Sequence, residues 1–176
     1  MQYITPYNPD WPHRFNRIAS HLAPFLPTMC QIHHVGSTSI SGMPAKDIID
    51  LDIECPHGAI PLVIAALAGA GYKHEGDKGI PGREAFRPLP DSGASHLPAH
   101  HLYACERGAE ALIKLLAFRD YLTSHPERAR WLAAKKIAVD NTAPTRDAYI
   151  EAKGDCYALI SAESLLWADQ TLGKTR

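Results

Sequence analysis

The stretch at residues 48–53 most constrains the fold of this chain, because hydrophobic and acidic side chains alternate along it from Ile49 onward. Three hydrophobic residues fall on one face of a strand, and Asp50 and Asp52 fall on the other. The hydrophobic residues are Ile49, Leu51 and Ile53. A strand with one apolar face packs that face against helices or another sheet. We therefore expect a β-strand here that holds two carboxylates on its other face, with Cα atoms roughly 7 Å apart.

The acidic pair of this strand has a chemical consequence. Two neighbouring carboxylates are costly unless a cation lies between them or one is protonated. Mg²⁺ binds one or two carboxylates together with phosphate oxygens of a substrate, as in phosphoryl and nucleotidyl transfer. The pair therefore predicts a Mg²⁺ site formed by Asp50 and Asp52 that also binds phosphate oxygens of a substrate.

A turn of small residues follows the strand that we expect at residues 29–35. Its sequence is Gly36-Ser37-Thr38-Ser39. Exposed amides and hydroxyls in such a turn can bind phosphate oxygens. Lys46, four residues before Asp50, would add a positive charge. Each motif alone is also common as an ordinary turn or an ordinary strand pair, so the prediction depends on their combination.

The rest of the chain has the helix and strand signals of a mixed α and β protein. A helix is predicted from Asp10, whose carboxylate would cap free amides, to the prolines at 24 and 27. Further strands are predicted at residues 72–75, 84–87 and 101–105, and a helix at 61–70. A helical part starts at residue 109 and includes a capping-box pattern at Ser124–Glu127. The last helix starts near Thr145, and its buried side should carry Ala148, Ala152, Cys156, Leu159, Ile160 and Leu166.

This order of elements predicts an α+β fold with a mixed β-sheet packed by helices and a helical C-terminal part. No linker is visible, so residues 1–176 are expected to form a single domain. The net charge of −1 gives no sign of a broad positive surface that would bind nucleic acid or an anionic membrane. The four cysteines are scattered and no leader or apolar span is seen, so we expect a cytoplasmic protein with reduced thiols.

The run from His34 to Asp52 closely resembles the signature of the GrpB family. This is a group of largely uncharacterised bacterial proteins related to the nucleotidyltransferase superfamily, and similar domains are fused to some dephospho-coenzyme A kinases. Tyr7–Pro12, His100–Tyr103 and Phe118–Leu122 also resemble family motifs. Further matching positions are His125, Pro126, Lys136, Tyr149 and Lys153. The resemblance covers nearly the whole chain.

The resemblance implies a nucleotidyltransferase-like fold and a Mg²⁺-dependent transfer from a nucleoside triphosphate to a small acceptor. Asp50 and Asp52 would bind the metal, and together with His101 they would form the catalytic group. The residues expected to bind the nucleotide are Gly36, Ser37, Thr38, Lys46, Arg119, Lys136 and Lys153.

The chain also departs from the family pattern. Asp47 stands where the family usually has proline, and Tyr103 where it usually has a second histidine. Active nucleotidyltransferases typically add a third carboxylate, for which Glu84 is a candidate. Two alternatives therefore remain open. One is a non-catalytic module that binds a nucleotide or coenzyme, and the other is a metal hydrolase using His100 or His101 with the aspartates.

Overall fold

The computed structural model describes residues 3–172, and the chain divides into two compact units. The sheet unit comprises residues 10–35 and 48–113. The helical unit comprises residues 1–9, 36–47 and 114–176, of which 1–2 and 173–176 are not described. The predicted strand pair belongs to the sheet unit, whereas the Gly-Ser-Thr-Ser turn belongs to the helical unit. The expectation of a single domain over residues 1–176 stays a prediction.

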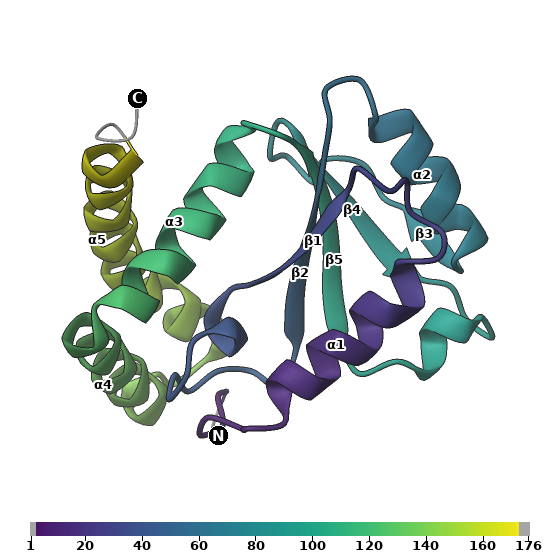
Figure 1. Ribbon diagram of the computed structural model, residues 1–176. Helices are drawn as coiled ribbons and strands as arrows, with labels where there is room; N and C mark the ends of the chain where they lie inside the picture. Colours follow the sequence, from purple (N-terminus) through teal and green to yellow (C-terminus); the bar gives the residue numbers. More distant parts are fainter. Residues whose placement is uncertain (1–2, 173–176) are drawn as a thin grey trace. The chain divides into compact units, whose positions relative to one another are not determined.

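The sheet unit is built on a five-stranded mixed sheet with the order β1-β2-β5-β4-β3 (Figure 1). Its strands are β1 (Gln31–Val35), β2 (Ile49–Cys55), β3 (Tyr72–His74), β4 (Arg83–Pro88) and β5 (His100–Glu106). β2 and β5 run parallel, and the other neighbouring pairs are antiparallel. Every strand predicted from the sequence is therefore present, with bounds that differ by one or two residues.

One face of this sheet is covered by α1 (Trp11–Leu22) and α2 (Ile60–Gly69). The hydrophobic residues of β2 form the centre of this helix-covered face, and Leu51 is fully buried. The Phe15 ring of α1 stacks on His34, which is paired with Leu51 across the antiparallel ladder. The ends of the two helices meet where the His21 ring bonds to the Ala70 carbonyl at 3.0 Å. The apolar face that the sequence predicts is thus the face that the helices cover.

The helical unit contains α4 (Pro126–Thr142), α5 (Arg146–Leu172) and α3 (Glu110–Ser124) from Lys114 onward. Its core combines helix residues with two from the loop at 36–47, which are Ile40 and Met43. Phe118, Tyr121, Leu122, Leu132 and Ile160 complete that core. Of the helices in residues 3–172, none combines the length and the apolar character that crossing a membrane requires.

The turn at 36–39 has a backbone that explains its glycine. Gly36 adopts φ +71° and ψ −169°, a region that is essentially restricted to glycine. A single 3₁₀ turn, Ser37–Ser39, follows it. The Ser39 hydroxyl donates to the Gly36 carbonyl at 2.6 Å, which closes the turn from within. Gly36 and Ser39 therefore maintain the turn, and the side chain of Ser37 can make other contacts.

Two predicted helix caps are wrong. Asp10 does occupy the N-cap position of α1, but its carboxylate accepts from Arg14 Nε at 2.8 Å and makes no capping bond. Ser124 is the last residue of α3, and its hydroxyl donates to the Asp120 carbonyl. The N-cap of α4 is therefore His125. Asp10 thus pairs with a nearby arginine, and Ser124 bonds to a carbonyl of the helix that it ends. Neither side chain binds the free amides at the start of the next helix.

The predicted buried side of α5 is wrong in part. Leu159 and Leu166 are 47% and 65% exposed, and Ala152 is exposed as well. The buried residues of this helix are Tyr149, Ile160 and Ser164. α5 carries apolar residues on two neighbouring sides, and the periodic pattern alone does not say which side meets the core.

The central strand provides a direct test of this packing. Leu51→Ala should lower the free energy of unfolding by about 2–5 kcal/mol, because it removes a fully buried side chain from the helix-covered face. Leu62→Ala, on the outer side of α2 where Leu62 is 62% exposed, should change it by less than about 1 kcal/mol. Urea denaturation of both variants measures the difference. Equal losses would contradict the assignment of faces.

Candidate functional site

The parallel pairing of β2 with β5 determines which side chains surround the two aspartates. Asp50 is paired with His101, and Asp52 is paired with Tyr103. Since directly paired residues point to the same side of a sheet, all four side chains share the face opposite to α1 and α2. His101 Nδ1 lies 2.9 Å from Asp50 Oδ1. The structure therefore places Asp50, Asp52 and His101 on one face, with a contact between Asp50 and His101, and their catalytic roles stay predictions.

Asp52 is the most unusual member of this group because its side chain is fully buried. Its Oδ2 accepts a hydrogen bond from the Cys105 thiol at 3.5 Å, and its Oδ1 has no hydrogen-bond partner among the described residues. Burial raises the pKa of Asp52 to about 7, although the Cys105 hydrogen bond and the charge of Arg83 act in the opposite direction. An ionised Asp52 thus costs free energy, and a cation at its free oxygen would offset that cost.

Arg83 and Tyr103 form the neighbouring part of this face. The Arg83 guanidinium lies over the Tyr103 ring, 4.2 Å from the ring centroid. Arg83 Nε is buried and has no hydrogen-bond partner in the described chain. Burial also raises the pKa of the Tyr103 hydroxyl, so that Tyr103 is a neutral phenol at physiological pH. Where the family usually has a histidine, this chain therefore presents a phenol and an arginine.

Glu84 does not supply the third carboxylate. It is paired with Ala104 in the antiparallel β4–β5 ladder, which places it on the helix-covered face, and its carboxylate bonds to His74. The carboxylate that does share the face of the aspartates is Glu54, two residues beyond Asp52. It accepts hydrogen bonds from Arg107 at 2.7 Å and is bonded to His33 at 2.9 Å. The Arg107 bond is the largest cause of its lowered pKa.

His100 is also on the wrong face for a metal site with the aspartates. Its Nε2 lies 2.8 Å from the Tyr72 hydroxyl and its Nδ1 lies 2.6 Å from the Pro98 carbonyl. Burial lowers its pKa. Within residues 3–172, no three His, Cys, Asp or Glu side chains are grouped to hold a metal ion. The form of the hydrolase alternative that relied on His100 is therefore wrong.

In the helical unit, Ser37 is the centre of a second group of polar side chains. Its hydroxyl lies 2.7 Å from the Tyr157 hydroxyl and accepts a hydrogen bond from Lys136 Nζ at 2.9 Å. Lys153 Nζ lies over the Tyr157 ring at 4.1 Å from the centroid, and Lys136 Nζ lies 5.9 Å from it. Lys136 is only 3% exposed. We call Ser37, Lys136, Lys153 and Tyr157 the Ser37 cluster.

The Ser37 cluster joins three residues that the sequence singled out and one that it missed. Tyr157 was not predicted as a site residue. The available signal was its spacing, since it lies four residues after Lys153 and so on the same side of α5. A serine hydroxyl, a phenol and two ammonium groups together suit the binding of a phosphate group.

The remaining predicted nucleotide-binding residues have other surroundings. Thr38 is buried, and Lys46 is half-buried in the same loop. Arg119 Nε donates to Asp120 Oδ1 of the same helix at 2.7 Å. Nucleotide contacts from Gly36, Thr38, Lys46 and Arg119 stay predictions.

Comparison with known sequences matches residues 3–163 to the family described as GrpB protein. The chain is 32% identical over 167 residues to the UPF0157 protein YqkA of Bacillus subtilis, covering 93% of this chain. It is 28% identical over 191 residues to a dephospho-CoA kinase of Mycolicibacterium paratuberculosis, covering 96% of this chain. The match spans 47% of the length of each of these two relatives. The predicted likeness to a kinase-fused domain is confirmed.

Comparison with solved structures confirms the predicted fold class. The crystal structure of the conserved protein GrpB from Enterococcus faecalis matches with a TM-score of 0.76 and 28% identity, over 92% of this chain and 96% of that one. The Cid1 poly(U) polymerase with MgGTP bound matches with a TM-score of 0.52, over 77% of this chain and 43% of that one. At 10% identity, the second match shows a shared nucleotidyltransferase-like fold and nothing more.

The raised pKa of Asp52 gives a pH-dependent prediction. A carboxyl whose pKa is raised by folding binds its proton more tightly in the folded state, so the free energy of unfolding falls as the pH rises from about 4 to about 7. Asp52→Asn removes this fall. Its stability relative to wild type should therefore increase by roughly 2–3 kcal/mol between pH 5 and pH 8.

Denaturant titrations in EDTA at four or more pH values measure this change. Asp155→Asn, which removes an exposed carboxylate from α5, is the matched control for the loss of one carboxylate. A pH-independent effect of Asp52→Asn would show that Asp52 does not titrate between the two pH values.

Proposed function

The chain belongs to the GrpB family, and from its polar side-chain groups we propose that it binds a nucleoside triphosphate with Mg²⁺ and transfers a nucleotidyl group to a small acceptor. The observation that carries this proposal is the aspartate pair of β2. Asp50 and Asp52 share one sheet face in a nucleotidyltransferase-like fold, and one buried oxygen of Asp52 has no hydrogen-bond partner within residues 3–172.

The residues of this face fit a magnesium ion. Mg²⁺ prefers carboxylate oxygens and commonly takes one or two of them, with substrate phosphates and water as its other ligands. Asp52 Oδ1 is a buried acceptor that needs a positive partner, and Asp50 is half-buried on the same strand face. When bound, the ion would neutralise phosphate charge during transfer. The protein's own part is to hold both carboxylates rigidly on the central strand.

The Ser37 cluster supports the phosphate part of the proposal. Lys136 is held by its hydrogen bond to Ser37, and Lys153 is held against the Tyr157 ring, so both ammonium groups are positioned before any ligand arrives. Positioned charges stabilise a phosphate better than flexible surface lysines, because little side-chain entropy is lost on binding.

A second candidate function is a nucleotide-binding module without catalytic activity. The observation that favours it is the composition of β5 beside the aspartates. Tyr103 is paired with Asp52, and Glu84 lies on the opposite face. Glu54, the further carboxylate on this face, is already bonded to Arg107 and His33. The two candidates share nucleotide binding and differ in turnover.

Isothermal titration with ATP, GTP, CTP and UTP, each with and without Mg²⁺, tests the shared part. We expect one nucleotide to bind more tightly with Mg²⁺, and Asp50→Asn to weaken that binding roughly 10- to 100-fold. Asp155→Asn serves as the control for the change of charge. The absence of binding by all four nucleotides would remove both candidates.

Lys136→Met tests the role of the Ser37 cluster. Methionine is close to lysine in length and leaves little empty space, and thermal unfolding checks that the variant stays folded. Nucleotide affinity should nevertheless fall about tenfold or more. Lys135→Met, at the exposed neighbouring position, should leave the affinity unchanged. An equal loss of affinity in both variants would mean that the effect comes from the change in net charge and not from the Ser37 cluster.

Release of pyrophosphate from the bound nucleotide separates the two candidates. The measurement uses the wild-type protein with the nucleotide that binds and with mixtures of small alcohols, amines and acids as acceptors. Acceptor-dependent release that disappears in Asp50→Asn supports transfer. Tight binding with no release for any acceptor mixture supports the module.

A further inference from the structure

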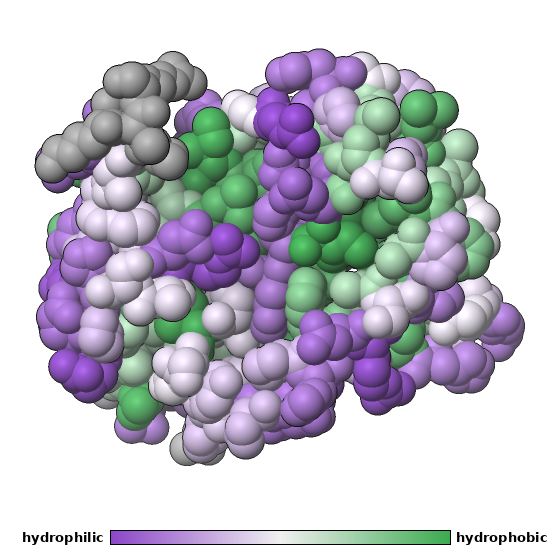
Figure 2. Space-filling view, in the orientation of Figure 1, coloured by the Kyte–Doolittle hydropathy of each residue, from purple (hydrophilic) through white to green (hydrophobic). Residues whose placement is uncertain are grey.

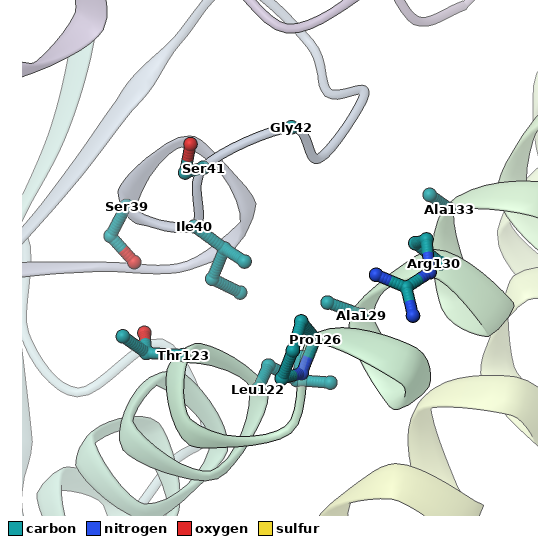
Figure 3. Close-up of a pocket in the computed structure, with 10 residues that line it drawn as sticks. All are labelled: Ser39, Ile40, Ser41, Gly42, Leu122, Thr123, Pro126, Ala129, Arg130 and Ala133. Carbon is teal, nitrogen blue, oxygen red and sulfur yellow. The ribbon is translucent and has the colours of Figure 1, made fainter.

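A cavity of about 410 Å³ lies in the helical unit beside the loop that follows Ser37 (Figure 3). Residues 39–42 form one wall, and the end of α3 with the first two turns of α4 forms the other. Cavities of roughly 300–1,000 Å³ are typical of small-molecule sites. None of the site residues predicted from the sequence lines this cavity, so it is distinct from both groups described above.

Most of the cavity wall is apolar. Ile40 comes from the loop, Leu122 from α3, and Pro126 and Ala129 from α4 (Figure 3). Ile40 and Leu122 are also buried members of the core of the helical unit, so the wall they form is rigid. Such a surface favours the hydrocarbon part of a ligand, because burying it removes apolar area from water.

Two hydroxyl groups of the cavity wall already donate hydrogen bonds within the protein. Ser39 Oγ donates to the Gly36 carbonyl at 2.6 Å, and Thr123 Oγ1 donates to the Arg119 carbonyl at 2.8 Å. Their hydroxyl hydrogens are therefore already used, and these groups offer only oxygen lone pairs to a ligand. The side-chain donors that remain for an anionic group are the Ser41 hydroxyl and the Arg130 guanidinium.

Arg130 is the charged donor of this pair, because it is the single charged residue among those that line the cavity, and its side chain is exposed. It forms no ion pair with another residue in the described part of the chain, whereas Arg128, on the same helix, binds Glu163 through two nitrogens. Figure 3 shows the Arg130 guanidinium extending from α4 on the side that faces the loop. A planar guanidinium without a carboxylate partner suits a carboxylate or phosphate oxygen pair.

We propose that this cavity binds a small organic acid. Arg130 holds the acidic group, and the hydrocarbon part lies against Ile40, Leu122 and Pro126. The proposal does not rest on nucleotide transfer, since all of these residues belong to the helical unit and none belongs to the Ser37 cluster. A carboxylate and a phosphate ester share the required chemistry, and the experiment distinguishes them.

The test uses the full chain and three probes of similar shape. Isocaproate carries a carboxylate, isopentyl phosphate carries a phosphate ester, and isocaproamide is the neutral match of the first. Heteronuclear NMR titration should show saturable shifts of the backbone amides at residues 39–42, 123 and 129–133 with at least one anionic probe, with dissociation constants in the millimolar range or lower. The anion that binds more tightly identifies the acidic group.

Two variants connect these shifts to the proposed contacts. Arg130→Gln should weaken binding of the anionic probe about tenfold, whereas Arg17→Gln, an exposed arginine of α1, should not change it. Ala129→Leu should block the apolar wall and abolish the shifts, with thermal unfolding as the check that the unit stays folded.

Three outcomes would overturn the proposal. They are equal binding of the neutral amide, no saturable shift with either anion, and an affinity that Arg130→Gln leaves unchanged. Because these measurements contain no nucleotide, each outcome is independent of whether the protein binds or transfers nucleotides.

Discussion

The parallel pairing of β2 with β5 is the constraint on which the sheet unit depends. It places Leu51 beside Leu102 under the helices and Asp52 beside Tyr103 on the opposite face. A shift of one residue would turn both aspartates toward α1 and α2 and expose the hydrophobic residues. The apolar face therefore determines the register of the two strands, and the register determines which polar side chains lie beside the aspartates. A fully buried Asp52 with an unpaired oxygen persists because its neighbours on the same strand are fully buried.

Each unit has its own group of polar side chains, maintained by its own packing. The sheet unit presents carboxylates, of which Glu54 is paired with His33 and Arg107 while Asp52 is only partly compensated. In the helical unit, the buried Lys136 would be costly without the Ser37 hydroxyl and the nearby Tyr157 ring. Metal binding calls for the first kind of group and phosphate binding for the second, so the proposed chemistry has a physical basis in each unit.

The arrangement of the site was predictable wherever it followed from the period of a strand. Alternation along the strand gave the shared face of Asp50 and Asp52. The position of Glu84 was not predictable, because its face depends on the register of β4 against β5 and not on its own strand. Tyr157 was missed for a related reason, since it reaches Ser37 across 120 residues of sequence.

The sequence by itself determined the element order, the mixed sheet with a helical C-terminal part, and the family, because hydrophobic periodicity and the signature run are local properties. Tertiary structure alone decided that α5 buries Tyr149 and Ile160 and leaves Leu159 exposed, and that Ser37 meets Lys136. The physical reason is the same in each case. A side chain with several possible partners takes the one that packing brings near, and packing joins residues that the sequence keeps apart.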